Sequence, residues 1–426
     1  MSRQPKEMYF LSFIELCQRF AFWGIGNLLV LFLVQEHQFS DAQATHLYGI
    51  FTGLAFALPM LGGYIADRTS HRAGVICGCI STAIGCFLIA TGSITLLYVA
   101  LLFAALGASI FTPSVYTILG NIYRGNSDLR EGGFTIYYAA VNIGVFLAVF
   151  TLGTLGHANL WLWAFVLAGC VQIIGLLTFL KIMKKPAFKE MHTSQSKTSA
   201  AVQKKPLTKQ EKQRIVVICV LSFVSILFWM SYNQGWSSMS IFALRYTAPQ
   251  IGSVTILPSW ILSIESLYLV ILAFPLAWMY KSLAKLKLDP SPALKTVYSL
   301  IAMGLCFFLM KSGAKLIPQG AQSAAVSPFY LLGAYAFMAV GEMLLAPIGL
   351  SMVTHLAPRR LTAFFVGAWY MCIGVAFYAG GLIAGLIATM ELSRFFEIFV
   401  LASWIPAVLL FFGVKKLKKM SHTNTR

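Results

Sequence analysis

The chain has 426 residues, of which 58% are hydrophobic and only 11% are charged, and its mean hydropathy is +0.76. A water-soluble domain needs more charge than this to cover its surface, so most of the surface is expected to face lipid. The net charge of +18 does not indicate nucleic-acid binding, because most lysines and arginines fall in alternate loops on one side of the apolar segments.

Apolar runs of about 20 residues recur along the whole chain, each long enough to cross roughly 30 Å of hydrocarbon. They predict an all-α membrane protein, without the short alternating segments of a membrane β-barrel. The twelve predicted spans are 8–34, 46–66, 73–92, 94–123, 133–155, 157–183, 214–243, 254–280, 292–312, 327–355, 361–388 and 393–415.

The long polar stretch 184–213 divides these spans six and six. It is rich in Ser, Thr, Gln and Lys and has little to bury. We therefore expect an N-terminal six-helix bundle over 1–183, a basic cytoplasmic linker, and a C-terminal six-helix bundle with a short tail over 214–426. This is the layout of major facilitator transporters, whose substrate site lies between the halves near the midplane. The positive-inside pattern predicts a multi-pass inner-membrane protein with both termini in the cytoplasm.

A charged turn, GGYIADRTSHR, follows the second predicted span. Its residues Gly63, Asp67, Arg68 and Arg72 resemble the cytoplasmic signature G-x-x-x-D-R-x-x-x-R of the major facilitators, which latches helix ends in one state of the cycle. The alternative is a solvated turn that obeys the positive-inside rule. The position of the turn between spans two and three favours the latch.

Ionisable residues inside a membrane are costly and call for a reason. Glu15 and Arg19 lie four residues apart on one helix face and can pair directly, and Gln18 can hydrogen-bond either of them. The pair either holds the bundle together or leaves Arg19 to meet an anionic substrate group. Glu265 and Glu342 lie within the eighth and tenth predicted spans with no basic residue there to neutralise them. We expect either proton coupling or a structural carboxyl at each.

Four segments in order resemble the proton-dependent oligopeptide transporter family, a branch of the major facilitators, over essentially the whole chain. The first is similar to E-x-x-E-R-F-x-Y-Y-G, the second to F-Y-x-x-I-N-x-G, and the third to F-W-x-x-x-E-Q-x-x-S, while the fourth follows the family's tenth and eleventh helices. These segments are ELCQRFAFWG (15–24), GFTIYYAAVNIGVF (133–146), FWMSYNQGWSS (228–238) and GEMLLAPIGLSMVTHLAPRRLTAFFVGAWY (341–370).

The departures from the family pattern concern charge. Gln18 stands at the second motif glutamate, Gly26 at a second arginine, Thr112 at the fourth-helix lysine and Asn233 at the seventh-helix glutamate, while Glu265 stands at an eighth-helix asparagine position. The resemblance thus implies a cavity in which neutral donors and acceptors replace full charges, so that a zwitterionic peptide would be held less firmly.

The resemblance implies a substrate site whose members come from both halves. Arg19 would anchor a carboxylate and Asn142 would hold amides, and aromatic residues would line an apolar pocket unless they face lipid or core. The expected set is Arg19, Asn142, Trp229, Asn233, Glu342, Trp369, Thr112, Phe22 and Trp23. Protons would enter through Glu15, Glu265 or Glu342.

We therefore expect a secondary active transporter that takes up di- or tripeptides, or peptide-like metabolites, together with protons. An alternative is a facilitator or exporter of another amphipathic metabolite, such as a siderophore or a modified amino acid. A membrane enzyme is disfavoured, because no nucleophile elbow, paired aspartates or metal-ligand spacing is present. We expect no metal, no cofactor and no nucleic acid as partner, and a monomer in the lipid bilayer.

Overall fold

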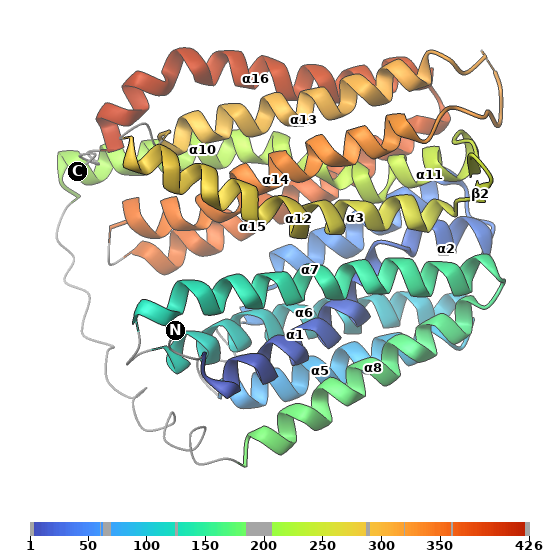
Figure 1. The fold of residues 1–426 in the computed structure, drawn as a ribbon, viewed down its shortest axis with the longest axis horizontal. Helices are drawn as coiled ribbons and strands as arrows, with labels where there is room; N and C mark the ends of the chain where they lie inside the picture. The colour runs from blue at the N-terminus through green and yellow to red at the C-terminus, as the bar shows by residue number, and fades with distance from the viewer. Residues whose placement is uncertain are drawn as a thin grey trace. The chain divides into compact units, whose positions relative to one another are not determined.

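The structure is a computed structural model that describes residues 4–59, 61–62, 70–123, 127–184, 207–286, 290–318, 320–358 and 361–421. Almost every described element is a helix, which is the form in which a chain satisfies its own backbone hydrogen bonds inside lipid (Figure 1). The helices are α1 (Lys6–Gly26), α2 (Leu29–Gln35), α3 (Asp41–Ala57), α5 (His71–Ile89), α6 (Ile94–Ile122), α7 (Ser127–His157), α8 (Trp161–Ile182), α10 (Lys209–Tyr232), η2 (Asn233–Trp236), α11 (Ser238–Arg245), α12 (Pro258–Lys285), α13 (Pro292–Ala314), α14 (Phe329–Leu356), α15 (Thr362–Ala384), η4 (Gly385–Ala388) and α16 (Leu392–Ser421).

Within the described residues, nine helices are long and apolar enough to cross a membrane. A tenth span results if α1 and α2 count as one, since they are bent by 42° at a short break. The all-helical membrane fold is thereby confirmed, and the total of twelve spans is consistent with it. The predicted first span 8–34 is interrupted, because the helix stops at Gly26 and restarts at Leu29.

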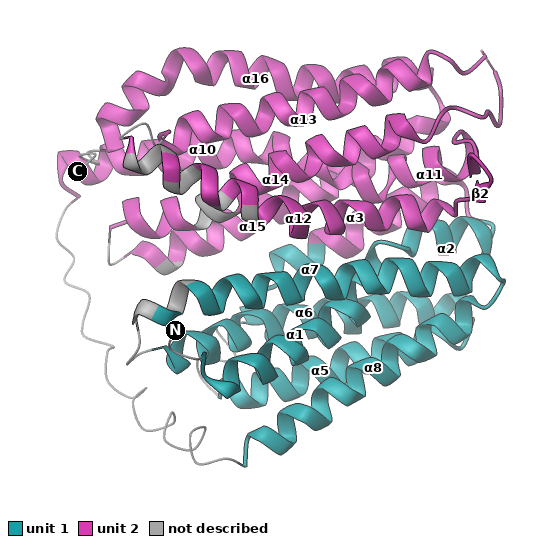
Figure 2. Cartoon of the chain, in the orientation of Figure 1, with its two compact units in different colours: residues 1–38, 54–202 teal, residues 39–53, 203–426 magenta. Residues whose placement is uncertain are grey.

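The chain divides into two compact units (Figure 2). Unit 1 comprises residues 1–38 and 54–202, and unit 2 comprises 39–53 and 203–426. Helix α3 is therefore shared: its first part groups with unit 2 and its last turn with unit 1. This division differs from the predicted bundles 1–183 and 214–426 in that residues 39–53 group with the C-terminal unit.

Unit 1 packs α1, α5, α6, α7 and α8 around a common core. Small residues let α5 and α6 approach closely, since a Cβ added to Gly107 would lie 2.8 Å from the carbonyl oxygen of Gly78. Such backbone contact is a usual way for membrane helices to associate. The core contains Met8, Leu11, Ile14, Val75, Cys79, Phe111, Val115, Ile118, Leu119, Tyr123, Tyr137, Phe179 and Ile182.

Unit 2 packs α13 along α14 and α16, and α10 along α15 and α16. The first part of α3 lies against α15, where a Cβ on Gly381 would fall 2.4 Å from the Cα of Gly49. Only glycine fits at both positions of such a crossing. Near the start of α3, Asp41 pairs with Arg245 of α11 at 2.6 Å.

The helix α10 ends at Tyr232 and continues through the 3-10 turn η2 into α11. The break leaves backbone groups that must find other partners in the apolar interior. The hydroxyl of Tyr335 donates to the Gly235 carbonyl oxygen at 2.6 Å, and the Gln234 amide donates to the Gly380 carbonyl oxygen at 2.9 Å. The predicted span 214–243 thus contains a 3-10 turn that is held by the Tyr335 side chain of α14 and by the backbone of α15.

A short hairpin of β1 (Gln250–Ile251) and β2 (Val254–Thr255) precedes α12. It turns at Gly252, whose φ of 62° favours glycine. The predicted span 254–280 therefore begins too early, and α12 begins at Pro258.

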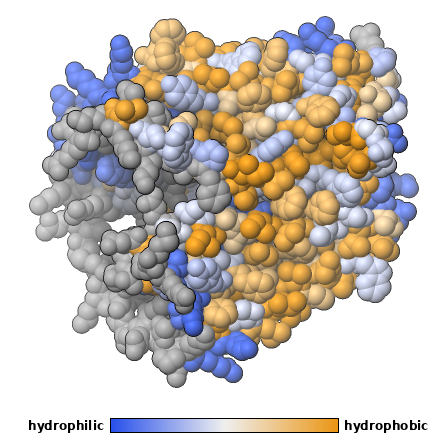
Figure 3. All heavy atoms as spheres, in the orientation of Figure 1, coloured by the Kyte–Doolittle hydropathy of each residue, from blue (hydrophilic) through white to orange (hydrophobic). Residues whose placement is uncertain are grey.

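Large hydrophobic side chains remain exposed on the outer faces of both units, including Trp163, Phe223, Trp278 and Phe412. In the face drawn in Figure 3, hydrophobic residues dominate and hydrophilic ones gather toward helix ends. A surface of this kind is suited to lipid rather than to water.

Candidate functional site

The first cluster lies in unit 1 and joins α1 to α7. Glu15 is fully buried and accepts a hydrogen bond from Nε of Arg19 at 2.6 Å. Its second carboxyl oxygen accepts from the hydroxyl of Tyr137 on α7. The Arg19 side chain is mostly buried, with 14% of its surface exposed. The predicted pairing of Glu15 with Arg19 is present, and its charges compensate each other within one helix.

Gln18 does not bind this pair as predicted. Its amide nitrogen donates to the Thr82 hydroxyl at 3.0 Å, and its carbonyl oxygen accepts from the Gln172 amide at 2.8 Å. The three side chains come from α1, α5 and α8 and are all buried. Gln18 therefore faces α5 and α8, whereas Glu15 faces Tyr137 of α7, and the hydrogen-bonded network of Gln18 contains no charged group.

The other predicted members from unit 1 occupy different settings. Phe22 is buried and meets the ring of Trp23 edge-on at 5.0 Å. Thr112 is half-buried in α6, beside Pro113. Asn142 is buried, and its amide donates to the Tyr138 carbonyl oxygen of its own helix at 3.0 Å. That amide is thus engaged with backbone here.

The second cluster lies in unit 2 and joins α10, α12 and α14. The hydroxyl oxygen of Tyr232 is 3.0 Å from Oε2 of Glu342 and 3.3 Å from Oε1 of Glu265. Sequence reasoning treated the two glutamates as separate candidates, but the fold makes them one cluster.

A phenol has one hydrogen to donate, so the Tyr232 hydroxyl can bond both carboxyl groups at once only if it donates to one and accepts from the other, which must then carry a proton. None of the ion pairs formed by described residues involves Glu265 or Glu342. The cluster therefore has the chemistry of a shared proton site, with a tyrosine hydroxyl that can follow the proton to either oxygen.

The tyrosines of both clusters were missed as candidates. Tyr137 and Tyr232 each lie inside a segment that resembles the family, but a phenol is neutral and carries no intramembrane charge signal. Their positions in the sequence could have identified them, because each tyrosine lies in one of the segments that resemble the family. Each lies on a different helix from the carboxyl group that it contacts.

Aromatic rings surround Tyr232. Trp229 lies edge-on to it at 5.3 Å, and Phe377 of α15 stacks on it at 6.4 Å. The indole nitrogen of Trp229 is buried and has no hydrogen-bond partner in the described part of the chain. Asn233 is fully buried in η2, with its amide 3.4 Å from the Thr52 hydroxyl. Of the predicted members from unit 2, Trp229, Asn233 and Glu342 thus lie around or next to Tyr232.

Trp369 on α15 is buried against Gly349 of α14, where a Cβ would fall 2.0 Å from the indole ring. No hydrogen bond joins it to the Tyr232 cluster among the described contacts. It is a packing residue in this conformation.

The predicted latch is described only in part. Gly63, Asp67 and Arg68 lie outside the described residues. Arg72 lies in the first turn of α5, and its backbone N–H donates to the Ser70 hydroxyl that caps the helix. Among the described side chains, no group of three or more His, Cys, Asp or Glu could hold a metal ion.

Comparison with known proteins identifies a family and several relatives of this chain. A family model described as Major Facilitator Superfamily matches residues 11–318. The peptide transporter YePEPT of Yersinia enterocolitica is 26% identical, over 94% of this chain and 91% of its own. Dipeptide and tripeptide permease A of Escherichia coli is also 26% identical, over 99% of this chain and 94% of its own.

Solved structures of similar fold include a peptide transporter of the POT family in complex with sulfate, with a TM-score of 0.88 and 23% identity over 98% of this chain and 96% of its own. A POT family transporter in complex with 5-aminolevulinic acid aligns with a TM-score of 0.87 and 19% identity, over 97% of each chain. The chain therefore belongs to the Major Facilitator Superfamily, a family of membrane transporters rather than enzymes, and its likeness to the oligopeptide transporter branch is confirmed.

Proposed function

We propose that this protein is a secondary active transporter that takes up di- or tripeptides, or peptide-like metabolites, together with protons. It would work by alternating access, with the predicted halves 1–183 and 214–426 as the moving bodies and 184–213 as their linker. The relatives named as peptide transporters and permeases support the substrate class.

The observation that carries the proposal is the cluster of Tyr232, Glu265 and Glu342. Two carboxyl groups bridged by a phenol, inside membrane helices and without a basic partner among the described ion pairs, are suited to binding and releasing a proton. Their helices α10, α12 and α14 are separate elements, so a change in protonation would alter how these helices are held together.

The substrate site would combine this cluster with residues of the first half. The Nε of Arg19 is engaged with Glu15, so the outer guanidinium nitrogens would meet a substrate carboxylate. Trp229, with its unpaired indole N–H, would donate to a carbonyl group of the substrate. The remaining proposed contacts are Thr112, Asn142, Asn233, Trp369, Phe22 and Trp23.

Glu15 is the weaker candidate for proton coupling, because Arg19 and Tyr137 already satisfy its carboxylate. The latch of Gly63, Asp67, Arg68 and Arg72 would act on the cytoplasmic side. We propose that the protein is a monomer in the cell inner membrane. The positive-inside pattern supports a cytoplasmic position of both termini.

The test is uptake of a radiolabelled dipeptide into proteoliposomes, with and without an inward proton gradient. Faster accumulation with the gradient, lost in Glu265→Gln and Glu342→Gln while counterflow exchange continues, is the expected result. Absence of gradient-driven uptake for every peptide tested would contradict the proposal. An outward proton gradient that drives another amphipathic metabolite into the proteoliposomes would instead favour the exporter alternative. The missing basic residues at Gly26 and Thr112 support that alternative.

A further inference from the structure

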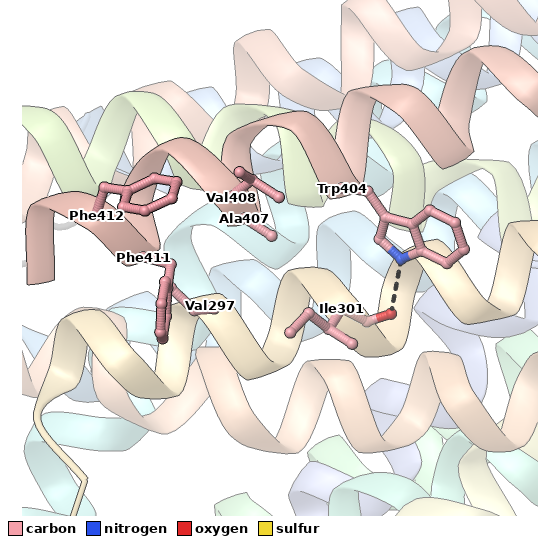
Figure 4. A pocket seen from close by; sticks show the side chains of 7 residues that line it. All are labelled: Val297, Ile301, Trp404, Ala407, Val408, Phe411 and Phe412. Atoms are coloured by element: carbon pink, nitrogen blue, oxygen red, sulfur yellow. Dashed lines mark hydrogen bonds between the residues drawn. The ribbon is translucent and has the colours of Figure 1, made fainter.

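The outer surface of unit 2 carries an apolar groove between α13 and α16 (Figure 4). Its cavity measures about 360 Å³ and is lined by Val297, Ile301, Trp404, Ala407, Val408, Phe411 and Phe412. The one polar side-chain group in this lining, the indole N–H of Trp404, donates to the Ile301 carbonyl oxygen at 3.3 Å. The groove therefore offers a ligand apolar contact only.

The end of the groove at Trp404 is built by close packing. Gly304 of α13 leaves room for the indole ring, since a Cβ there would lie 1.9 Å from the indole nitrogen. From this end the groove runs along α16 past Val408 to Phe411 and Phe412, which are 57% and 79% exposed.

A lysine cluster follows the groove on α16. Lys415, Lys416, Lys418 and Lys419 are all exposed, and none of them joins an ion pair with another described residue. At 3.6 residues per turn, Lys415 lies about 10° from the mean direction of the five groove residues of α16, whereas Lys416 lies about 110° from it. Lys418 and Lys419 lie to either side of Lys415, each about 50° from that direction.

The spacing between groove and lysines matches one leaflet of a bilayer. Lys415 lies eleven positions after Trp404, which is about 16 Å of helix at roughly 1.5 Å per residue. Half of a hydrocarbon core of about 30 Å is roughly 15 Å. An acyl chain that reaches Trp404 would therefore place its headgroup at the depth of Lys415.

We propose that this groove and the lysines that follow it form a binding site for an anionic phospholipid, with an acyl chain in the groove and the phosphate at Lys415, Lys418 and Lys419. Juxtamembrane lysines attract anionic headgroups in this way. A second copy of the chain is a poorer occupant, because groove-to-groove contact about a twofold axis along the membrane normal would place the two lysine clusters at the same depth, facing each other.

The test is a titration of the delipidated full-length protein in detergent with phosphatidylglycerol and, separately, phosphatidylcholine of the same acyl chains. Bound lipid is counted by native mass spectrometry, and stabilisation is followed as the thermal unfolding midpoint. Phosphatidylglycerol should bind more tightly than phosphatidylcholine. Lys415→Gln should weaken phosphatidylglycerol about fivefold, the equivalent of ~1 kcal/mol per basic residue near the headgroups.

Lys416→Gln is the matched control, with the same charge change one residue away and facing aside, and it should change affinity less than twofold. Val408→Trp, which fills the groove and leaves the lysines in place, should weaken both lipids. Equal binding of the two lipids by the unaltered chain, or equal losses in Lys415→Gln and Lys416→Gln, would overturn the proposal. A dimer in the mass spectrum that Val408→Trp dissolves would assign the groove to a second copy instead.

Discussion

Both membrane clusters join a buried glutamate to a tyrosine hydroxyl, but the third member is a cation in one cluster and a second carboxyl group in the other. In unit 1, Glu15 meets Tyr137 and Arg19, and the arginine is supplied four residues away on the same helix. In unit 2, Glu265 and Glu342 meet Tyr232, and the place of the arginine is taken by a second carboxyl group. A carboxylate with a built-in cation is already neutral as a pair, whereas a pair of carboxyl groups needs a proton or a cationic ligand from outside. The first arrangement is suited to holding a helix pair, and the second to exchanging a proton.

The largest effect is expected where this compensation is broken. Glu15→Gln leaves Arg19 mostly buried without its counter-charge, so it should lower the unfolding free energy by about 3–5 kcal/mol. An unfolding titration in detergent micelles measures the loss. The double variant Glu15→Gln/Arg19→Gln should recover part of it, since it removes the orphaned charge. Equal losses in the single and double variants would mean that the ion pair does not hold the unit.

The second expectation concerns the carboxyl pair as one unit. Glu265→Gln, Glu342→Gln and the double variant should each reduce gradient-driven uptake by a similar factor, in the range of about 5–150-fold that coupling energies span. A shared proton is lost when either partner is gone, so the effects should not add. Uptake rates in proteoliposomes at equal peptide concentration measure this. Additive losses would show two independent sites.

A smaller effect is expected for the phenol that joins the pair. Tyr232→Phe keeps the ring and its stacking on Phe377 but removes a hydrogen bond, worth about 1 kcal/mol or roughly fivefold in uptake. Tyr137→Phe is the matched change in unit 1. It should leave the gradient dependence of uptake unaltered. If both variants lose the same gradient dependence, the contrast between the clusters fails.

The smallest effect is expected at a fourth carboxyl group, Asp41, which pairs with Arg245 before the predicted span 46–66. Partial burial raises the pKa of Asp41, and Arg245 acts in the opposite direction. Arg245→Gln should lower the unfolding free energy by only about 0.2–1 kcal/mol at pH 7, because the pair is partly exposed.

The sign of the pH dependence follows from which form of Asp41 the arginine favours. Without Arg245 the pKa of Asp41 in the folded protein rises further above its ordinary value in the unfolded chain. Protonation of Asp41 then favours the folded state; this stabilisation is complete below the ordinary pKa and is lost as pH rises through the raised pKa. The variant should thus match the unaltered protein at acid pH and fall behind it toward pH 7. Unfolding midpoints between pH 4 and pH 8 test this, with Asp41→Asn as the pH-independent control. A gap that widens toward acid pH would contradict it.

Much of this could be predicted from the sequence because lipid imposes strong local rules. Runs of apolar residues had to become helices, and the four motif segments were enough to identify the family likeness. The i,i+4 spacing of Glu15 and Arg19 was enough to predict their contact, since both lie on one face of one helix.

The tertiary structure decided everything that joins residues distant in the chain. Tyr232, Glu265 and Glu342 lie on three helices, and no periodicity states which faces of those helices meet. Gln18 shows the same limit within a single motif: its turn of the helix points toward Thr82 and Gln172 rather than toward Glu15. The 3-10 turn at Asn233–Trp236 likewise depends on Tyr335 and Gly380, which lie far along the chain and hydrogen-bond to it. Hydropathy along a chain reports the solvent of each segment, whereas the partners of a buried polar group are set by how the segments pack.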